Sequence, residues 1–197
     1  MKLTDVKLVN QGRHLALYQA EYAISSTIDK TYEFVSRAGA RDSGPGSSGI
    51  LDVKTFPDQA VRGVIIMAFT PDKTKVLLMR EFRPVINTTI FNHPMGLIDP
   101  GETPVSAGTR EIKEETGLDV INVLRVAPPT YVAPGITDQK VATIVVTAGG
   151  KIKPSTNPIE ITDPFWADRP TVRTLLNDPD NKFSLMTQAS LYAWACA

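Results

Sequence analysis

The sequence predicts a layered α+β fold. Short segments that alternate apolar and polar residues fill positions 1–40, and a helical segment at 104–116 interrupts the later strands. Two further helical segments end the chain. Strands that enclose one helix and then give way to helices are typical of an α+β domain built in layers.

The N-terminal segments are LTDVKLV, HLALYQAEYAI and KTYEFVSRA. Their period of two, with Tyr and Val enrichment, predicts two or three antiparallel strands. The Gly- and Ser-rich stretch 40–49 then predicts a loop. We therefore expect a small antiparallel β subdomain over 1–55, which packs on the rest or on a second copy, and a main domain over 56–197.

The main domain is predicted to contain strands and helices in alternating blocks. Its predicted strands are 59–70, 75–82, 87–94, 120–126, 141–147 and 159–166, with loops at 127–135 and 149–158. The final helices are predicted at 170–177 and 184–194, the second capped by Ser184.

Composition excludes several classes of protein. The 197 residues carry 21 basic and 21 acidic side chains, so zero net charge argues against a general nucleic-acid or anionic-membrane binder. The single cysteine, Cys196, permits no intrachain disulfide. No stretch has the length of a membrane span or the layout of a signal peptide, so we expect a cytoplasmic protein.

The helix at 104–116 has a defined start and end. Thr103 is a good N-cap, and Pro104 suits the first helical turn, where its missing N–H costs nothing. Gly117 is suited to the left-handed conformation that ends a helix.

Acidic residues gather on one face of this helix. Glu111 is followed at i+3 and i+4 by Glu114 and Glu115, and Glu102 lies just before the helix. Carboxylates this close repel one another unless a cation intervenes, and Mg²⁺, with Mn²⁺ as the alternative, suits oxygen ligands. Arg110 could pair with one carboxylate. The other interpretation is a solvated, salt-bridged surface helix.

The stretch 96–118, GLIDPGETPVSAGTREIKEETGL, resembles the signature of the Nudix hydrolases, G-x5-E-x7-R-E-U-x-E-E-x-G-U, at every specified position. The family's fold is an α/β/α sandwich with a mixed sheet and a catalytic loop-helix. Four weaker matches resemble its ADP-ribose and nucleoside-diphosphate-sugar pyrophosphatase branch. They are REFRP at 80–84, PMGLIDPGE at 94–102, Pro134 sixteen residues after Leu118, and IEI at 159–161 with Trp166 and a helical tail.

The resemblance implies roles at the metal and the diphosphate. Glu111 and Glu115 would be the chief metal ligands, Glu114 a ligand or the residue that polarises the attacking water, and the Met95 carbonyl a further ligand. Glu102 and Arg110 would complete this catalytic group, and Arg83 and Arg37 would hold the diphosphate.

The resemblance also implies a base-binding site, in which Tyr32 and His14 stack on adenine and the Pro134 loop contributes. For Arg37 and Tyr32 the alternative is an ordinary exposed strand face.

The chain departs from the branch at 92–96, where NHPMG replaces Glu-Phe-Pro-Ala-Gly. Asn92 removes a carboxylate and Met95 enlarges a side chain beside the metal. His93 could serve as a base, although a histidine at a strand end is more often only hydrogen bonded. Asn157 is aligned with a glutamate that activates water in the branch, and Glu160 or Asp138 could serve instead.

The sequence thus predicts a Mg²⁺-dependent pyrophosphatase, with ADP-ribose as first substrate and AMP and ribose 5-phosphate as products. The alternatives are another nucleotide sugar, or a Nudix-fold nucleotide sensor that does not cleave its ligand. We also expect a homodimer whose N-terminal strands reach toward the partner's active site.

Overall fold

The structure, a computed structural model, describes residues 1–41, 49–54, 56, 60–153, 155 and 162–196. The chain divides into two compact units. The first comprises Met1–Arg62, Ile98–Gly101 and Pro129–Val141. The second comprises Gly63–Leu97, Glu102–Pro128 and Ala142–Ala197. The boundary predicted between residues 55 and 56 stays a prediction.

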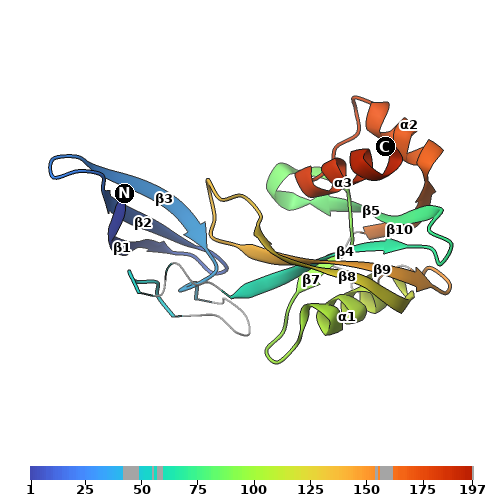
Figure 1. The fold of residues 1–197 in the computed structure, drawn as a ribbon, viewed down its shortest axis with the longest axis horizontal. Helices are drawn as coiled ribbons and strands as arrows, with labels where there is room; N and C mark the ends of the chain where they lie inside the picture. The colour runs from blue at the N-terminus through green and yellow to red at the C-terminus, as the bar shows by residue number, and fades with distance from the viewer. Residues whose placement is uncertain (42–48, 55, 57–59, 154, 156–161, 197) are drawn as a thin grey trace. The chain divides into compact units, whose positions relative to one another are not determined.

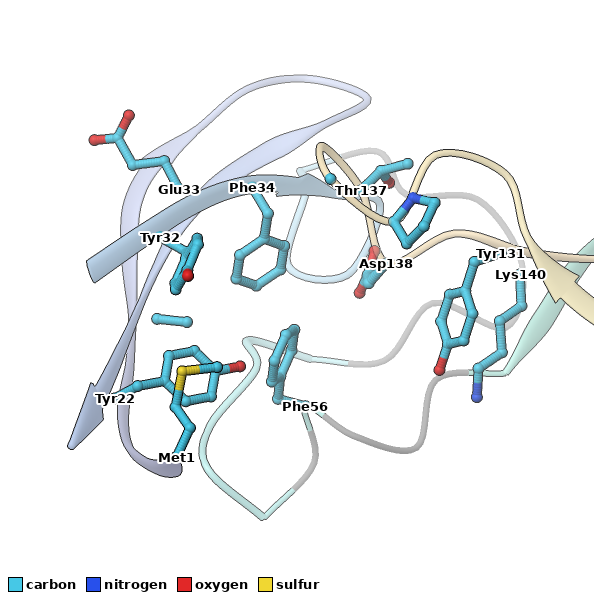
Figure 2. Close-up of a pocket in the computed structure, with 13 residues that line it drawn as sticks. Met1, Tyr22, Tyr32, Glu33, Phe34, Phe56, Tyr131, Thr137, Asp138 and Lys140 are labelled. Atoms are coloured by element: carbon cyan, nitrogen blue, oxygen red, sulfur yellow. The ribbon is translucent and has the colours of Figure 1, made fainter. Parts of the chain in front are cut away.

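The first unit contains a three-stranded antiparallel sheet in the order β1 (Lys2–Gln11), β2 (Ala16–Ala23) and β3 (Asp29–Ser36). The predicted alternation buries one face, where Val6 and Tyr18 belong to an apolar cluster. Phe34 stacks on Tyr18, with ring centroids 5.4 Å apart, and Phe56 packs beside Phe34. This aromatic packing continues into a cavity on the same unit (Figure 2).

The larger sheet has seven strands in the order β10-β5-β4-β9-β8, with β6 paired to β5 and β7 paired to β4. The strands are β4 (Val61–Phe69), β5 (Lys75–Arg83), β6 (Thr88–Asn92), β7 (Met95–Leu97), β8 (Asp119–Tyr131), β9 (Lys140–Gly149) and β10 (Thr162–Asp168). A short 3₁₀ turn, η1 (Pro84–Ile86), connects β5 to β6.

Helices cover both faces of this sheet in the second unit (Figure 1). On one face lies α1 (Pro104–Thr116), which packs so closely that a Cβ on Gly108 would collide with Ile144. On the other face, α2 (Arg169–Asn177) and α3 (Leu185–Ala195) bury Phe69, Leu78 and their neighbours. This arrangement confirms the α+β, α/β/α fold class predicted from the sequence.

Several predicted strand boundaries differ from the observed ones by one or two residues, and one differs by more. The loop predicted at 127–135 begins later, because β8 continues through Tyr131. Pro128 and Pro129 are compatible with a strand here because β8 lies at the end of the strand order, where a missing N–H interrupts no ladder on its outer side. The last strand begins at Thr162 and ends at Asp168, and the predicted positions 159–161 lie outside the described residues.

Within the described residues, no helix has both the length and the apolar character needed to cross a membrane. The cytoplasmic location stays a prediction.

Candidate active site

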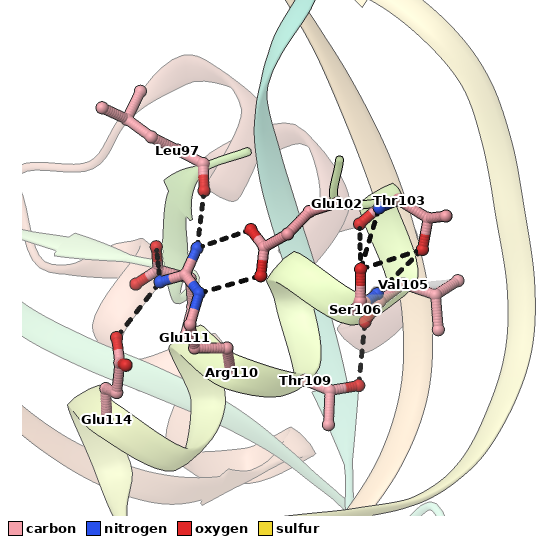
Figure 3. Close-up of polar contacts among 9 residues, drawn as sticks. All are labelled: Leu97, Glu102, Thr103, Val105, Ser106, Thr109, Arg110, Glu111 and Glu114. Atoms are coloured by element: carbon pink, nitrogen blue, oxygen red, sulfur yellow. Dashed lines mark hydrogen bonds and ion pairs between the residues drawn. The ribbon is translucent and has the colours of Figure 1, made fainter. Parts of the chain in front are cut away.

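Local sequence determines both ends of α1, as predicted. The Thr103 side chain accepts a hydrogen bond from the Ser106 backbone N–H (3.1 Å), and the Ser106 hydroxyl accepts one from the Thr103 N–H (2.8 Å; Figure 3). This reciprocal pair satisfies two donors that a helix start otherwise leaves open. Gly117 ends the helix with φ of 72°, and its N–H donates to the Lys113 carbonyl. The helix therefore spans the predicted residues 104–116.

Arg110 is the centre of the polar contacts on α1 (Figure 3). Its Nε and Nη2 donate to the two carboxylate oxygens of Glu102 at 3.0 and 2.9 Å. Its Nη1 donates to Glu111 at 2.9 Å and to Glu114 at 3.1 Å, and Nη2 also donates to the Leu97 carbonyl at 2.9 Å. The sequence predicted one carboxylate partner, and the structure has three.

These contacts affect both charge and geometry. The hydrogen bonds that Arg110 donates to Glu102, followed by those to Glu111 and Glu114, raise the pKa of Arg110 above its ordinary value despite partial burial. The bidentate pair with Glu102 is the strong, planar form of this interaction. Arg110 therefore fixes the loop before the helix to the carboxylates on the helix.

Gly96 allows Glu111 to approach strand β7. A Cβ at position 96 would overlap the Glu111 carboxylate, so only glycine permits the observed packing. The Glu111 side chain is 14% exposed, whereas that of Glu114 is 58% exposed. The first glycine of the signature thus has a steric role that concerns one particular glutamate.

The donor set fits a divalent cation in its chemistry. Glu111, Glu114 and Glu115 would supply carboxylate oxygens and the Met95 backbone a carbonyl, and Mg²⁺ prefers such hard ligands. In this structure the Arg110 guanidinium bridges Glu111 and Glu114. Across the described ranges, no three His, Cys, Asp or Glu side chains are grouped so as to hold a metal ion. The predicted ligands therefore stay predictions.

A second group of polar contacts surrounds Arg83 at the end of β5. Its Nη2 lies 2.9 Å from a carboxylate oxygen of Glu81 and 3.3 Å from the sulfur of Met95. The side chain is 37% exposed, so the guanidinium remains accessible to a ligand. Asn92 donates to the same oxygen of Glu81 at 3.2 Å.

His93 is buried and hydrogen bonded, which is the role that the sequence favours over catalysis. Its Nε2 lies 2.7 Å from the Ser190 hydroxyl on α3, and its backbone N–H donates to Thr187. Burial lowers the pKa of His93 to about 4. A neutral imidazole tied to α3 holds the end of β6 against that helix.

The first unit contains a cavity of about 520 Å³ whose lining includes five aromatic rings (Figure 2). Tyr22 and Tyr32 meet edge to face at 5.8 Å, and the rings of Phe34 and Phe56 are 4.7 Å apart. At the other end, the Lys140 ammonium lies over the ring of Tyr131. Such a cavity can stack a planar ligand and present a cation to it.

Two predicted substrate residues, Tyr32 and Pro134, line this cavity. Arg37 and His14 belong to the same unit but are not among its lining residues, and Arg83 belongs to the second unit. The Nε of Arg37 is buried, and no residue in the described part of the chain accepts a hydrogen bond from it.

Asp138, the predicted alternative base, also lines the cavity and accepts a hydrogen bond from Ser36 at 2.8 Å. Burial raises the pKa of this carboxyl. The other two residues in that hypothesis, Asn157 and Glu160, lie outside the described residues, so the missing-base hypothesis stays a prediction.

Sequence reasoning missed most of the cavity wall. Tyr22, Phe34, Phe56 and Tyr131 come from four separate segments, and only the Tyr32-x-Phe34 spacing indicated that aromatic rings share one strand face.

The fold and the charged loop-helix define an α/β/α sandwich domain with a candidate active site on α1, and comparison with known proteins identifies its family. The NUDIX domain profile matches residues 60–188. The chain belongs to the Nudix family. Hydrolases of this family generally use divalent metal ions.

Individual relatives agree with this assignment. A putative nudix hydrolase 2 of Caenorhabditis elegans is 33% identical over 103 residues, which cover 51% of this chain and 46% of the worm protein. An ADP-sugar pyrophosphatase of Mus musculus is 23% identical over 201 residues, which cover 99% of this chain and 86% of the mouse protein. The chain therefore spans less than half of the worm protein but most of the mouse protein.

A crystal structure of an ADP compounds hydrolase superposes with a TM-score of 0.71 at 21% identity, covering 100% of this chain and 93% of that one. This match concerns the fold. The sequence relatives, among them the mouse ADP-sugar pyrophosphatase, confirm the predicted resemblance to the ADP-ribose pyrophosphatase branch of the Nudix hydrolases.

Proposed function

We propose that this chain is a Mg²⁺-dependent pyrophosphatase that cleaves a nucleoside diphosphate linked to a second moiety. ADP-ribose is the first candidate substrate, with AMP and ribose 5-phosphate as products. The observation that carries the proposal is the Arg110 cluster, in which three of the four signature glutamates, Glu102, Glu111 and Glu114, accept hydrogen bonds from one guanidinium. The similarity to an ADP-sugar pyrophosphatase over 99% of the chain supports the substrate class.

Glu111 and Glu115, with the Met95 carbonyl, would hold the cation, and Glu114 would bind it or orient a water molecule. When bound, Mg²⁺ supplies neutralisation of the diphosphate charge and lowers the pKa of a bound water. Arg110 keeps Glu111 in the orientation that the close approach to Gly96 requires. The Glu114 side chain is more than half exposed, which favours its role in orienting a water molecule.

The diphosphate and the base would contact other residues. Arg83 has an accessible guanidinium suited to phosphate oxygens, and the buried Nε of Arg37 favours a second such contact. The rings of Tyr32 and its neighbours in the cavity are suited to stacking on adenine, and Pro134 lines the same cavity. His14 stays in the proposal as an additional stacking residue.

We further propose a homodimer whose N-terminal strands reach the partner's active site. Several large apolar side chains of the β1–β3 region are exposed, among them Val9 at 51%, Leu15 at 48% and Ile28 at 55%. A twofold, isologous contact would cover such side chains on both copies. Light scattering at micromolar concentration should give twice the chain mass, and a single-chain mass would contradict this proposal.

A panel of nucleoside diphosphate compounds with Mg²⁺, scored for released nucleoside monophosphate, tests the proposed activity. We expect release from ADP-ribose that stops when EDTA removes the cation. Faster release from another nucleotide sugar would change the substrate, for which the Asn92 and Met95 departures give a reason. Binding of the panel compounds without release would favour the sensor.

A further inference from the structure

Asn92 connects α3 to the polar group around Arg83. The residue is 1% exposed, at the end of β6. Its Oδ1 accepts hydrogen bonds from the hydroxyls of Ser184, at 2.7 Å, and Thr187, at 3.0 Å. Its Nδ2 donates to Glu81 at 3.2 Å and faces the Met95 sulfur at 3.8 Å. One buried amide therefore contacts four side chains.

The partners determine which way the amide points. The Glu81 carboxylate only accepts hydrogen bonds, so the NH₂ group of Asn92 must face it. The Ser184 and Thr187 hydroxyls can donate, and they therefore face the carbonyl oxygen. An aspartate or a glutamate at position 92 would have no NH₂ group to donate to Glu81.

The same oxygen of Glu81 holds Arg83. Oε2 accepts from Asn92 Nδ2 at 3.2 Å and lies 2.9 Å from Arg83 Nη2. Arg83 Nη2 also contacts the Met95 sulfur, at 3.3 Å, so Arg83 and Asn92 share both partners. In the described part of the chain, the contacts of Arg83 use Nη2 alone, which leaves Nε and Nη1 available to phosphate oxygens.

We propose that Asn92 is a positioning residue for diphosphate binding. It fixes the Glu81 carboxylate from the α3 side, and Glu81 with Met95 then holds the Arg83 guanidinium in one orientation before the ligand arrives. An Arg side chain ordered in advance loses less conformational freedom on binding. The inference rests on the proposed function to the extent that Arg83 binds a diphosphate.

A double-mutant cycle on the full chain tests this inference, with ADP and Mg²⁺ as the probe and calorimetry as the measurement. Asn92→Leu removes the amide at similar volume and should raise the Kd for ADP about tenfold. Arg83→Ala should raise it further. The double variant should bind no more weakly than Arg83→Ala alone, because Asn92 acts through Arg83.

Two companion variants keep the test decisive. If Asn92→Leu does not fold, Glu81→Gln replaces it in the cycle. This variant leaves Asn92 and α3 intact but weakens the contact between Glu81 and Arg83, so its effect on the Kd for ADP should also disappear when Arg83 is alanine. Ser190→Ala removes the hydroxyl contacts to His93 and to the Thr187 carbonyl but leaves the side-chain hydrogen bonds of Asn92 in place, so it should keep the native Kd.

Three results would overturn the inference. They are multiplicative increases of Kd in the double variant, a native Kd in a folded Asn92→Leu chain, or a Kd that rises in Ser190→Ala as much as in Asn92→Leu. So would failure of the native chain to bind ADP. The cycle measures binding and not turnover. If the chain binds ADP but hydrolyses no panel compound, the proposed activity is wrong, and the Asn92 test can still be interpreted.

Discussion

The α1 site and the first-unit cavity are built in opposite ways. The α1 site takes its charged side chains from the stretch between Gly96 and Gly117 and is held by ion pairs to Arg110. The cavity takes its aromatic walls from β2 and β3, from Phe56 and from the segment around Tyr131. Contacts between residues close in sequence can be predicted from their spacing. A cavity wall assembled from distant segments can be predicted only when the fold is known.

The two regions also differ in what they can contribute to a reaction. Fixed carboxylates act on charge that develops during phosphoryl transfer, so damage to them should appear in kcat. Aromatic rings contact a base equally in the ground state and the transition state, so damage to them should appear in KM. Substitutions in each region can separate these effects.

The largest effect should come from Glu115→Gln, which keeps the shape of the side chain and removes its charge. We expect kcat to fall by roughly 10²-fold or more, because metal and electrostatic contributions dominate such sites. Circular dichroism should show a folded chain. Lys113→Gln is the matched control on the same helix, since Lys113 pairs with Asp119 rather than with the signature glutamates. Near-native turnover of Glu115→Gln at saturating Mg²⁺ would exclude α1 as the catalytic centre.

Gly96→Ala should also reduce kcat, by roughly tenfold or more, because a 1 Å displacement of a catalytic group can cost up to about 10²-fold. The added Cβ overlaps the Glu111 carboxylate and must displace it. Gly49→Ala, at a position where a Cβ meets nothing and outside the cavity, provides the control. Unchanged kcat in Gly96→Ala would mean that the position of Glu111 is not critical.

In the cavity, Tyr32→Ala should raise KM for ADP-ribose about tenfold with little change in kcat, since one stacked base contributes ~1–3 kcal/mol. Tyr192→Ala is a control of similar exposure, 45% against 42% for Tyr32, on α3. Steady-state kinetics over a wide substrate range separates the two constants. A native KM in Tyr32→Ala would return Tyr32 to an ordinary exposed strand face.

The smallest effect concerns stability. Burial lowers the pKa of His93 to about 4 from the ordinary 6.5, so between these values the unfolded chain binds a proton that the folded chain does not. The resulting contribution to stability is complete above the unfolded pKa and is lost as pH falls toward the folded pKa. Unfolding free energy should drop by roughly 2 kcal/mol from pH 7 to pH 5 through this group. Urea unfolding of His93→Gln should lack that part of the slope, and an identical slope would contradict the assignment.

The same contrast explains how much the sequence could predict. Thr103, Pro104 and Gly117 determine α1 by local rules, so its boundaries were predictable to the residue. Glu102 and Arg110 were predictable as members of the site because the signature spacing brings them to one loop and helix. The number of carboxylates around Arg110 was not predictable, because it depends on side-chain rotamers.

Longer-range features had no comparable local signal. The continuation of β8 through Pro128 and Pro129 depends on the edge position of that strand, which is a property of sheet order. Asn92 looked like a lost carboxylate, and only the fold brings Ser184, Thr187 and Glu81 around its amide.

The double variant Glu115→Gln/Tyr32→Ala tests the division of roles most directly. If α1 performs the chemistry and the cavity binds the base, the two losses should multiply. Its kcat for ADP-ribose should match Glu115→Gln alone, its KM should match Tyr32→Ala alone, and kcat/KM should fall by roughly 10³-fold. A double variant no slower in kcat/KM than Glu115→Gln alone would contradict the account.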